Sequence, residues 1–473
     1  APTMLYGLSL VCLFGNQGIL TTGFFGSMPA LAVDINLYEP VSLFGLSLHP
    51  GIIMSEVIFA FPPAMMILLV ALGNTDARLY EAAKSLGAGP VRTFFTVTLP
   101  GVKYGLISAV FVCFTLSFTD FGAPKVVGGN YSVLAVDIYK QVIGQQNFGM
   151  GATVSIILLV PTVAAFIADR IIQRRQVVAM SARSVPFSPK RYLPSDLAFL
   201  AACAAIAGFL LVMLFTAGYA SLVKAWPYDF TLGLQHYSFE GMGGGGYEAF
   251  TNSLKMAAYS ALIGAPLTFI SAYLIEKSKG LGILRQVAYF LSIIPLALPG
   301  LVIGIAYIFF FNSPTINIPF TGHGVPNPFN FIYATMAILV LSNVIHFYTV
   351  NFLTATTALR QLDREFETVS ESMAVPFYVT FFRVTAPVCL PALLEIAMYY
   401  FVSAMATVSA VIFLYSPDLQ LASVAVVNMD DAGDTIPAAA MCMLIVAANV
   451  VVRILFEGLS YTIRKKTQAW RSR

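Results

Sequence analysis

Long apolar stretches separated by short polar segments are the main pattern of this chain. Several exceed the roughly 20 residues that a helix needs to cross the hydrocarbon core of a bilayer. Ten-residue strands with alternating polarity, the mark of a membrane barrel, are absent. We therefore predict an all-α polytopic membrane protein with ten helices, at 3–17, 50–73, 103–124, 149–172, 195–218, 250–275, 286–312, 329–354, 389–414 and 436–459.

One polar segment between two of these helices has an unusual sequence. In residues 79–100, apolar positions spaced i, i+3, i+4, i+7 predict a short helix, with Asp76 as its N-cap. Gly87 and the Gly89-Pro90 pair should end this helix. We expect a second short helix over 92–97, stopped by Pro100.

The same segment returns later in the chain. Adding 287 to the residue numbers aligns 79–100 with 366–387, so that Asp76 matches Asp363 and Pro100 matches Pro387. The second copy departs from the first at several positions, because Thr368 stands in place of Glu81 and Ala374 in place of Gly87. Two such segments in one chain predict an internal repeat.

The charges set the orientation of the repeat. With both segments inside, all but four of the 26 Lys and Arg residues lie on the inner side, as the positive-inside rule requires. The exceptions are Lys125, Lys140, Lys224 and Lys255. The halves then run in the same direction, related by a pseudo-two-fold axis along the membrane normal. We place the first half at 1–172, a basic cytoplasmic linker at 173–194 and the second half at 195–473.

The repeat also predicts that the first half is shortened. Residues 1–7 resemble 298–304, inside the third helix of the second half. Counterparts of about 195–297 are then missing from the first half, which leaves it four helices against six. We expect the natural chain to be longer at its N-terminus.

The paired segments resemble the EAA loops of importer-type ABC transporter permeases. The resemblance implies that each loop docks on an ATPase subunit. The first loop would do so through Glu81, Ala82, Ala83, Leu86 and Gly87. The degenerate second loop would use Thr368, Val369, Ser370, Met373 and Ala374. It further implies the type I importer fold, a homodimeric ATPase that binds ATP and Mg²⁺, a periplasmic or extracellular substrate-binding protein, and a bacterial inner membrane location.

Over nearly its whole length the chain is similar to permeases with two fused halves from the ferric iron, thiamine and phosphonate group. The stretches 119–151 and 413–434 look most like permeases for 2-aminoethylphosphonate. The resemblance therefore implies import of 2-aminoethylphosphonate. Ferric iron and thiamine are the alternatives within the same machinery.

The chain itself carries no catalytic signature. It has no Walker-type loop, no nucleophile elbow and no zinc motif, so we expect neither enzymatic activity, nor a cofactor of its own, nor a nucleic-acid partner. The five cysteines are isolated and the four histidines form no i, i+4 pair, which favours packing roles. Only 10% of the residues are charged, against about a quarter in soluble domains.

Charged residues inside the apolar runs are candidates for a translocation path, because burying a charge in the bilayer is costly. Asp120 could face the path or bond to Thr119 and a neighbouring helix. Asp430 and Asp431 could lie at its outer mouth, where they would attract a cationic group or a binding protein. For Glu56, Glu395 and Arg453 we favour interfacial positions.

Two other classes of protein remain open. An ion-coupled secondary transporter would need ionisable groups at the membrane midplane or inverted repeats, whereas these repeats are parallel. A membrane scaffold would explain the composition but not the paired loops. An ATPase that copurifies at two copies per chain would separate the importer from both.

Overall fold

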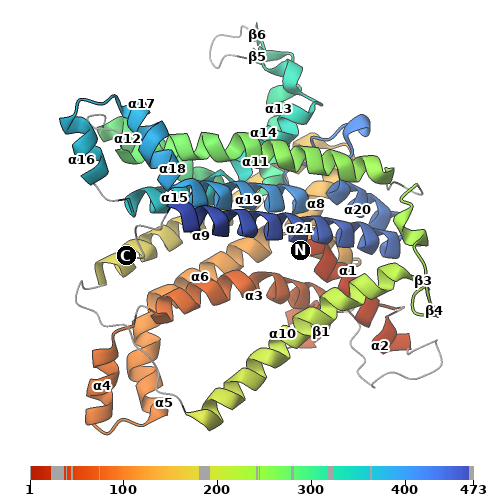
Figure 1. Ribbon diagram of the computed structural model, residues 1–473. Coiled ribbons are helices and arrows are strands. Elements are labelled where there is room, and N and C mark those ends of the chain that lie inside the picture. The colour runs from red at the N-terminus through yellow and green to blue at the C-terminus, as the bar shows by residue number, and fades with distance from the viewer. Residues whose placement is uncertain are drawn as a thin grey trace.

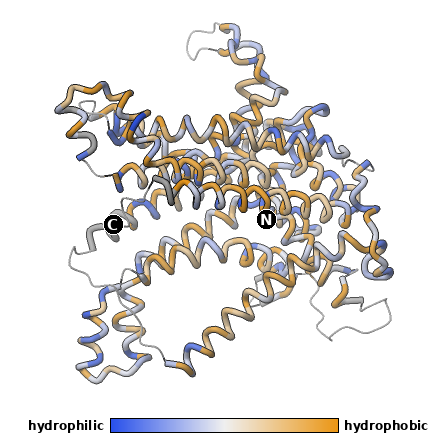
Figure 2. The backbone as a smooth tube through the Cα atoms, in the orientation of Figure 1, coloured by the Kyte–Doolittle hydropathy of each residue, from blue (hydrophilic) through white to orange (hydrophobic). Residues whose placement is uncertain are grey.

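The computed structural model describes residues 2–16, 18–22, 37–38, 40–43, 46–73, 75–179, 192–240, 243, 245–277, 282–317, 324–362 and 365–467. Its long helices run side by side (Figure 1). Hydrophobic residues follow these helices, while hydrophilic ones gather towards the two ends of the bundle (Figure 2). A bundle of this kind satisfies every backbone group within its own helices, which the bilayer demands.

The first part of the chain forms nine α-helices among the described residues. They are α1 (Thr3–Phe14), α2 (Ile19–Thr22), α3 (Pro50–Gly73), α4 (Ala77–Ser85), α5 (Pro90–Thr93), α6 (Leu99–Thr119), α7 (Gly122–Val127), α8 (Leu134–Tyr139) and α9 (Phe148–Ala179). A π-helical turn, Phe94–Thr98, joins α5 to α6, and another, Lys140–Gly144, follows α8.

The second part begins with three further helices and then repeats most of this order. It contains α10 (Leu193–Leu222), α11 (Gly246–Lys277), α12 (Gly282–Ile293), α13 (Gly300–Phe311), α14 (Met336–His346), α15 (Tyr348–Arg360), α16 (Glu365–Ser372), α17 (Phe377–Thr380), α18 (Ala386–Val388), α19 (Leu390–Ala406), α20 (Ala422–Asp431) and α21 (Thr435–Thr467). A third π-helical turn, Phe381–Thr385, joins α17 to α18.

Strands occur only as three short antiparallel hairpins in the described part of the chain. They pair β1 (Val41–Leu43) with β2 (Leu46–Leu48), β3 (Val223–Ala225) with β4 (Asp229–Leu232), and β5 (Thr315–Asn317) with β6 (Gly324–Pro326). All three lie in connections between helices, so the fold class is all-α, as the hydrophobic pattern predicts.

Six described helices are long and apolar enough to cross a membrane, and three bent helix pairs raise the number to nine. The predictions of single helices at 286–312 and 329–354 are wrong, because each contains a bend, whereas the predicted helix at 389–414 begins at the third bend. The chain bends by 110° between residues 297 and 300, by 55° at Phe347 and by 74° at Cys389. Two of the bends are next to prolines, Pro299 and Pro391, because proline lacks the N–H that would continue the helix.

The expected stop at Pro100 is also wrong. Residues 90–119 form one continuous helix, because the π-helical turn widens the backbone two residues before the proline ring. The second copy has the same turn two residues before Pro387. A wider turn removes the clash between the ring and the preceding carbonyl, so proline is tolerated inside the helix.

The structure repeats at the same offset of 287 residues. Helix α9 begins at Phe148 and α21 at Thr435, while the π turns begin at Phe94 and Phe381. Helix α9 continues to Ala179, so the start of the predicted linker is helical, and 180–191 lie outside the described residues. Helix α10, at the start of the second half, packs against α1 of the first half and against α21.

Candidate functional site: paired loops and the cavity between the halves

The two predicted loops lie at the same end of the bundle. Helices α4 and α16 project there, apart from each other, at the left of Figure 1. Their outer side chains are free: Leu86 is 84% exposed and Met373, its equivalent, is 70% exposed. Only Ala83 of the predicted apolar face is buried. Exposed apolar groups on short helices are typical of a docking surface.

Both loops have the same backbone despite their different sequences. Asp76 caps α4 by accepting a hydrogen bond from the Arg78 N–H at 3.1 Å, as predicted; its equivalent, Asp363, lies outside the described residues. Gly87 ends α4 with φ +71°, and Ala374 ends α16 with φ +52°. In both copies the next residue donates its N–H to the carbonyl five residues earlier, at 3.0 Å. The alanine therefore preserves the turn of the first loop, at the cost of a strained backbone.

A side-chain hydrogen bond ties each loop helix to the helix that follows. The Tyr80 hydroxyl donates to Thr98 Oγ1 at 3.1 Å. In the second loop the hydroxyls of Ser370 and Thr380 bond to each other. Each loop is thus fixed to a helix that continues into the membrane bundle.

A cavity of 450 Å³ lies between the two halves. Its walls contain residues at equivalent positions of the repeat, but their chemistry differs. Phe59 faces it from the first half and His346 from the second. Two further pairs replace an apolar residue of the first half by a polar one: Val112 by Tyr399 and Leu116 by Ser403. Without the repeat alignment, no sequence pattern identifies His346 or Tyr399 as a cavity residue.

Asp120 lines this cavity and is also bonded to neighbouring helices. Its carboxylate accepts the Ala123 N–H at 2.9 Å, at the start of α7, and interacts with the side chain of Thr3 on α1. Thr119, the expected partner, instead donates to the carbonyl of Thr115. Asp169 is the second carboxylate in the wall, and it accepts a hydrogen bond from Ser108 at 2.7 Å.

Of the other charged residues in the apolar helices, some are buried and some are exposed. Glu56, two turns inside α3, is only 8% exposed and lies beside Asp120 and Ser117. Its interfacial position in the membrane stays a prediction. Glu395 lines a second cavity of 650 Å³. Arg453 is exposed and pairs with Glu457 at 3.0 Å.

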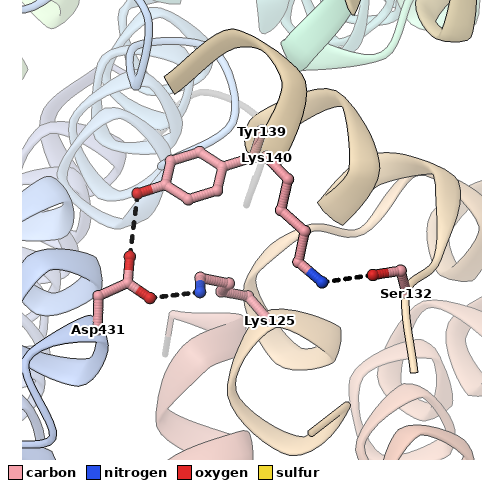
Figure 3. A network of polar contacts seen from close by, with 5 residues as sticks. All are labelled: Lys125, Ser132, Tyr139, Lys140 and Asp431. Carbon is pink, nitrogen blue, oxygen red and sulfur yellow. Dashed lines mark hydrogen bonds and ion pairs between the residues drawn. The ribbon is translucent and has the colours of Figure 1, made fainter. Parts of the chain in front are cut away.

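The predicted outer residues Asp430 and Asp431 lie at the end of α20, opposite α4 and α16 (Figure 1). Asp431 contacts Lys125 and Tyr139 of the first half (Figure 3). Burial and the neighbouring Asp431 raise the pKa of Asp430 to about 6, although Lys125 opposes this rise. Sequence reasoning identified the acidic residues but missed their partners, whose only signal was the rarity of Lys on this side.

The described residues contain no group of three or more His, Cys, Asp and Glu side chains that could hold a metal ion. All five cysteines are free thiols. Most of the residues that line the cavity are apolar, and Asp120 and Asp169 supply its carboxylates.

A helical bundle with two matched loops at one end and a cavity between its halves has the architecture of a transport permease. The chain belongs to the family of binding-protein-dependent transport system inner membrane components, whose model matches residues 2–178 and 264–465. It is thus a multi-pass inner membrane component of a transport system, and the relatives described next are named permease proteins.

Several curated proteins are similar to this chain. The ferric transport system permease protein FbpB of Actinobacillus pleuropneumoniae is 27% identical over 467 residues, which is 97% of this chain and 64% of that protein. A putative ferric permease, FbpB 1, of Haemophilus influenzae is 27% identical over 89% of this chain and 63% of its own length. The putative 2-aminoethylphosphonate permease PhnU of Salmonella typhi is 25% identical over 37% of this chain and 58% of its own length. The chain thus spans somewhat less than two thirds of the ferric relatives.

Proposed function

We propose that this chain is the transmembrane subunit of an ATP-driven importer that receives its cargo from a substrate-binding protein. Helices α4 and α16 would each dock on one subunit of an ATPase homodimer, which binds ATP and Mg²⁺. The observation that carries this proposal is the pair of exposed loops with the same backbone at the same end of the bundle. The binding protein would dock at the opposite end.

Each loop has a rigid connection to the cavity. From Pro90 the helix runs without a break to Thr119, whose neighbour Asp120 lines the cavity wall. In the second half, α17 to α19 lead to Ala406 and Thr407 in the same wall, with one bend. Closure of the ATPase dimer would draw the loops together, and the helices would transmit the movement and open the cavity outward.

The chemistry of the cavity favours ferric iron as the cargo. Its wall contains Asp120, Asp169 and Tyr399, and none of its described lining residues is Lys or Arg. Carboxylate and phenol oxygens suit a hard, highly charged cation. A phosphonate is an anion that proteins bind through Arg and Lys. The match to the ferric permease of Actinobacillus pleuropneumoniae over 97% of the chain supports the same cargo.

The second candidate cargo is 2-aminoethylphosphonate. A match of 183 residues to the putative permease PhnU favours it, together with the resemblance of 119–151 and 413–434 to such permeases. Its amino group would suit the carboxylates of the cavity, but its phosphonate group would have no cationic partner in the wall.

Copurification and uptake test the proposal. We expect an ATPase to copurify at two copies per permease chain, and proteoliposomes with the cognate binding protein to take up radioactive ferric iron only with internal ATP. Uptake of labelled 2-aminoethylphosphonate instead would change the cargo and leave the importer intact. A permease that binds no ATPase, or that transports on an ion gradient alone, would contradict the proposal.

A further inference from the structure

Helix α20 ends with two acidic residues, Asp430 and Asp431. Negative charge at the C-terminal end of a helix is unfavourable, because the last carbonyl groups already carry partial negative charge. A neutral or basic residue there would suit the helix dipole better. The position of Asp431 is therefore better explained by a contact outside its own helix.

That contact is with the other half of the molecule. Lys125, near the end of α7, forms an ion pair with Asp431, and its side chain is only 15% exposed. The Tyr139 hydroxyl, at the end of α8, donates to the other carboxylate oxygen of Asp431 at 3.1 Å. The Lys125 ammonium also lies 5.5 Å from the centre of the Tyr139 ring. Figure 3 shows these three side chains converging from both halves.

The burial of Lys125 makes this contact specific. A lysine this far out of water loses much of its hydration, so it depends on the Asp431 carboxylate and on the ring of Tyr139. A lone exposed ion pair would contribute little. By contrast, Lys140, one residue after Tyr139, bonds to Ser132 within its own half (Figure 3).

The contact is also close to the cavity. Helix α7 begins at Gly122, and Asp120 to Gly122 form part of the cavity wall. Lys125 follows one turn later. A movement that separates the halves at this end would have to break the Lys125–Asp431 pair and move α7 relative to α20.

We propose that Lys125, Tyr139 and Asp431 form an outer latch that holds the halves together in the outward-closed state and opens once in each transport cycle. This inference rests on the proposed importer function. The latch lowers the free energy of the outward-closed state, so that the ATPase turns over slowly until the loaded binding protein docks. Without the latch, the outward-open state becomes more populated and the ATPase runs without cargo.

Charge exchange tests the latch. In proteoliposomes with the ATPase, Lys125→Glu and Asp431→Lys should each raise ATP hydrolysis in the absence of binding protein by about three-fold or more. The double exchange should return it to within about two-fold of the wild type. Lys140→Glu is the matched control and should behave as the wild type. Three results would each overturn the latch. The single variants could hydrolyse ATP at the wild-type rate, the double exchange could hydrolyse ATP as fast as the faster single variant, or Lys140→Glu could show the same rise as the single variants.

A reversible cross-link gives a second test. Lys125→Cys and Asp431→Cys, in a chain whose five native cysteines are replaced, would be joined by a bis-methanethiosulfonate reagent. A maleimide-linked polymer labels free thiols, so the loss of labelling at both cysteines would confirm that the link has formed. Uptake should stop in the linked protein and return with dithiothreitol, whereas full uptake with the link intact would overturn the latch.

The two proposals can fail separately. A wild-type chain that binds no ATPase would overturn the importer function. The contact would then be tested by measuring the melting temperatures of the same four charge variants in detergent. Each single variant should melt at a lower temperature than the wild type, and the double exchange should restore the wild-type melting temperature. Additive losses in the double variant would show that the pair is not coupled, which overturns the latch itself.

Discussion

Gly87 ends the first loop helix with φ +71°, and no atom lies within 4 Å of where a Cβ would stand. Its requirement for glycine is therefore a property of the backbone and not of packing. Gly89, two residues later, has equally open surroundings but φ −69°, which any residue adopts. Comparing the same substitution at the two glycines therefore distinguishes the effect of backbone strain from the effect of side-chain volume.

We predict that Gly87→Val strains the turn by about 1–2 kcal/mol, because a β-branched residue resists the left-handed conformation. The turn should shift, so that ATP-driven uptake falls while the amount of protein in the membrane stays constant. Gly89→Val is the control and should transport normally. Uptake and membrane abundance of both variants are the measurements, and normal uptake by Gly87→Val would count against a docking role for the turn.

In the second loop a strained residue can be replaced by glycine, which is the reverse of Gly87→Val. Ala374 has φ +52°, so Ala374→Gly should relieve about 1 kcal/mol of strain there. We expect slower amide hydrogen exchange in α16 and unchanged or tighter ATPase binding. Faster exchange would mean that the gain in flexibility of the unfolded loop outweighs the relief of strain.

The sequence could predict Gly87 but not its counterpart. A glycine after an amphipathic helical segment commonly marks the end of a helix, whereas an alanine at position 374 does not indicate a left-handed backbone. Only the repeat at 287 residues relates the two positions. The cavity residues His346 and Tyr399 are similar cases, because their role depends on helices that meet in space.

At the scale of elements, α11 and α19 form an extensive helix contact in the second half. Gly264 of α11 lies against the ring of Tyr400 of α19, and an added Cβ would be 3.0 Å from two ring carbons. The Tyr400 hydroxyl bonds to Thr268 one turn later, at 2.8 Å. A small residue lets the two helices approach closely, as is common in membrane bundles.

We predict that Gly264→Leu separates these helices and lowers the melting temperature in detergent, with a cost of about 1–3 kcal/mol from overpacking. Gly208→Leu is the control: Gly208 is in the middle of α10 and has no neighbour within 4 Å of an added Cβ. It should leave the melting temperature nearly unchanged. Equal losses in both variants would show that leucine perturbs any helix here, whatever its packing.

Hydropathy places the apolar helices in the right order but predicts ten spans, whereas the described residues have six, or up to nine with the bent pairs, and α1 is shorter than a span. The bends do not follow from hydropathy. The apolar run at 286–312 looks continuous, yet its chain turns by 110° between α12 and α13. Hydropathy reports which residues avoid water but carries no information on helix direction. At Pro100 the error is in the opposite direction: a helix end is predicted where the helix continues, because a π-helical turn cannot be predicted from residue type alone.

At the scale of the whole molecule, the outer contact between the halves should depend on pH. Asp430 faces Lys125, Asp431 and Tyr38, and its pKa is raised to about 6 in the folded protein. A raised pKa means that the folded state binds the proton more tightly than the unfolded state. The contribution to stability is then fully present below about pH 4 and is lost as pH rises through 6.

We therefore predict that this carboxyl raises the stability of the protein by about 1 kcal/mol as pH falls from 7 to 5. Asp430→Asn should remove this part of the pH dependence and increase the melting temperature at pH 7. Melting curves of both proteins in the same detergent across this range are the measurement. An identical slope in the variant would show that another group titrates.

The matched backbones of the two loops suggest that their sequences are exchangeable. Replacing Glu367, Thr368, Val369, Ser370 and Ala374 by Tyr, Glu, Ala, Ala and Gly would give the second loop the first loop's residues at these five positions. Thr385 already stands where Thr98 does, so the new tyrosine could form the same tie to the following π turn. The exchange removes the Ser370–Thr380 bond but supplies its counterpart.

We predict that the chain with these five substitutions binds the ATPase at least as tightly as the wild type and still transports. The reverse exchange, which gives the first loop the residues of the second, should weaken binding about ten-fold or more, because it removes Glu81 and places alanine at φ +71°. Affinities of both chains for the purified ATPase are the measurement. Since the halves must move together against a symmetric ATPase, the asymmetry between the loops would then be tolerated divergence and not a requirement of the mechanism. Failure of the chain with the five substitutions in its second loop would instead mean that each half needs its own contact surface, so that backbone identity alone does not define the docking site.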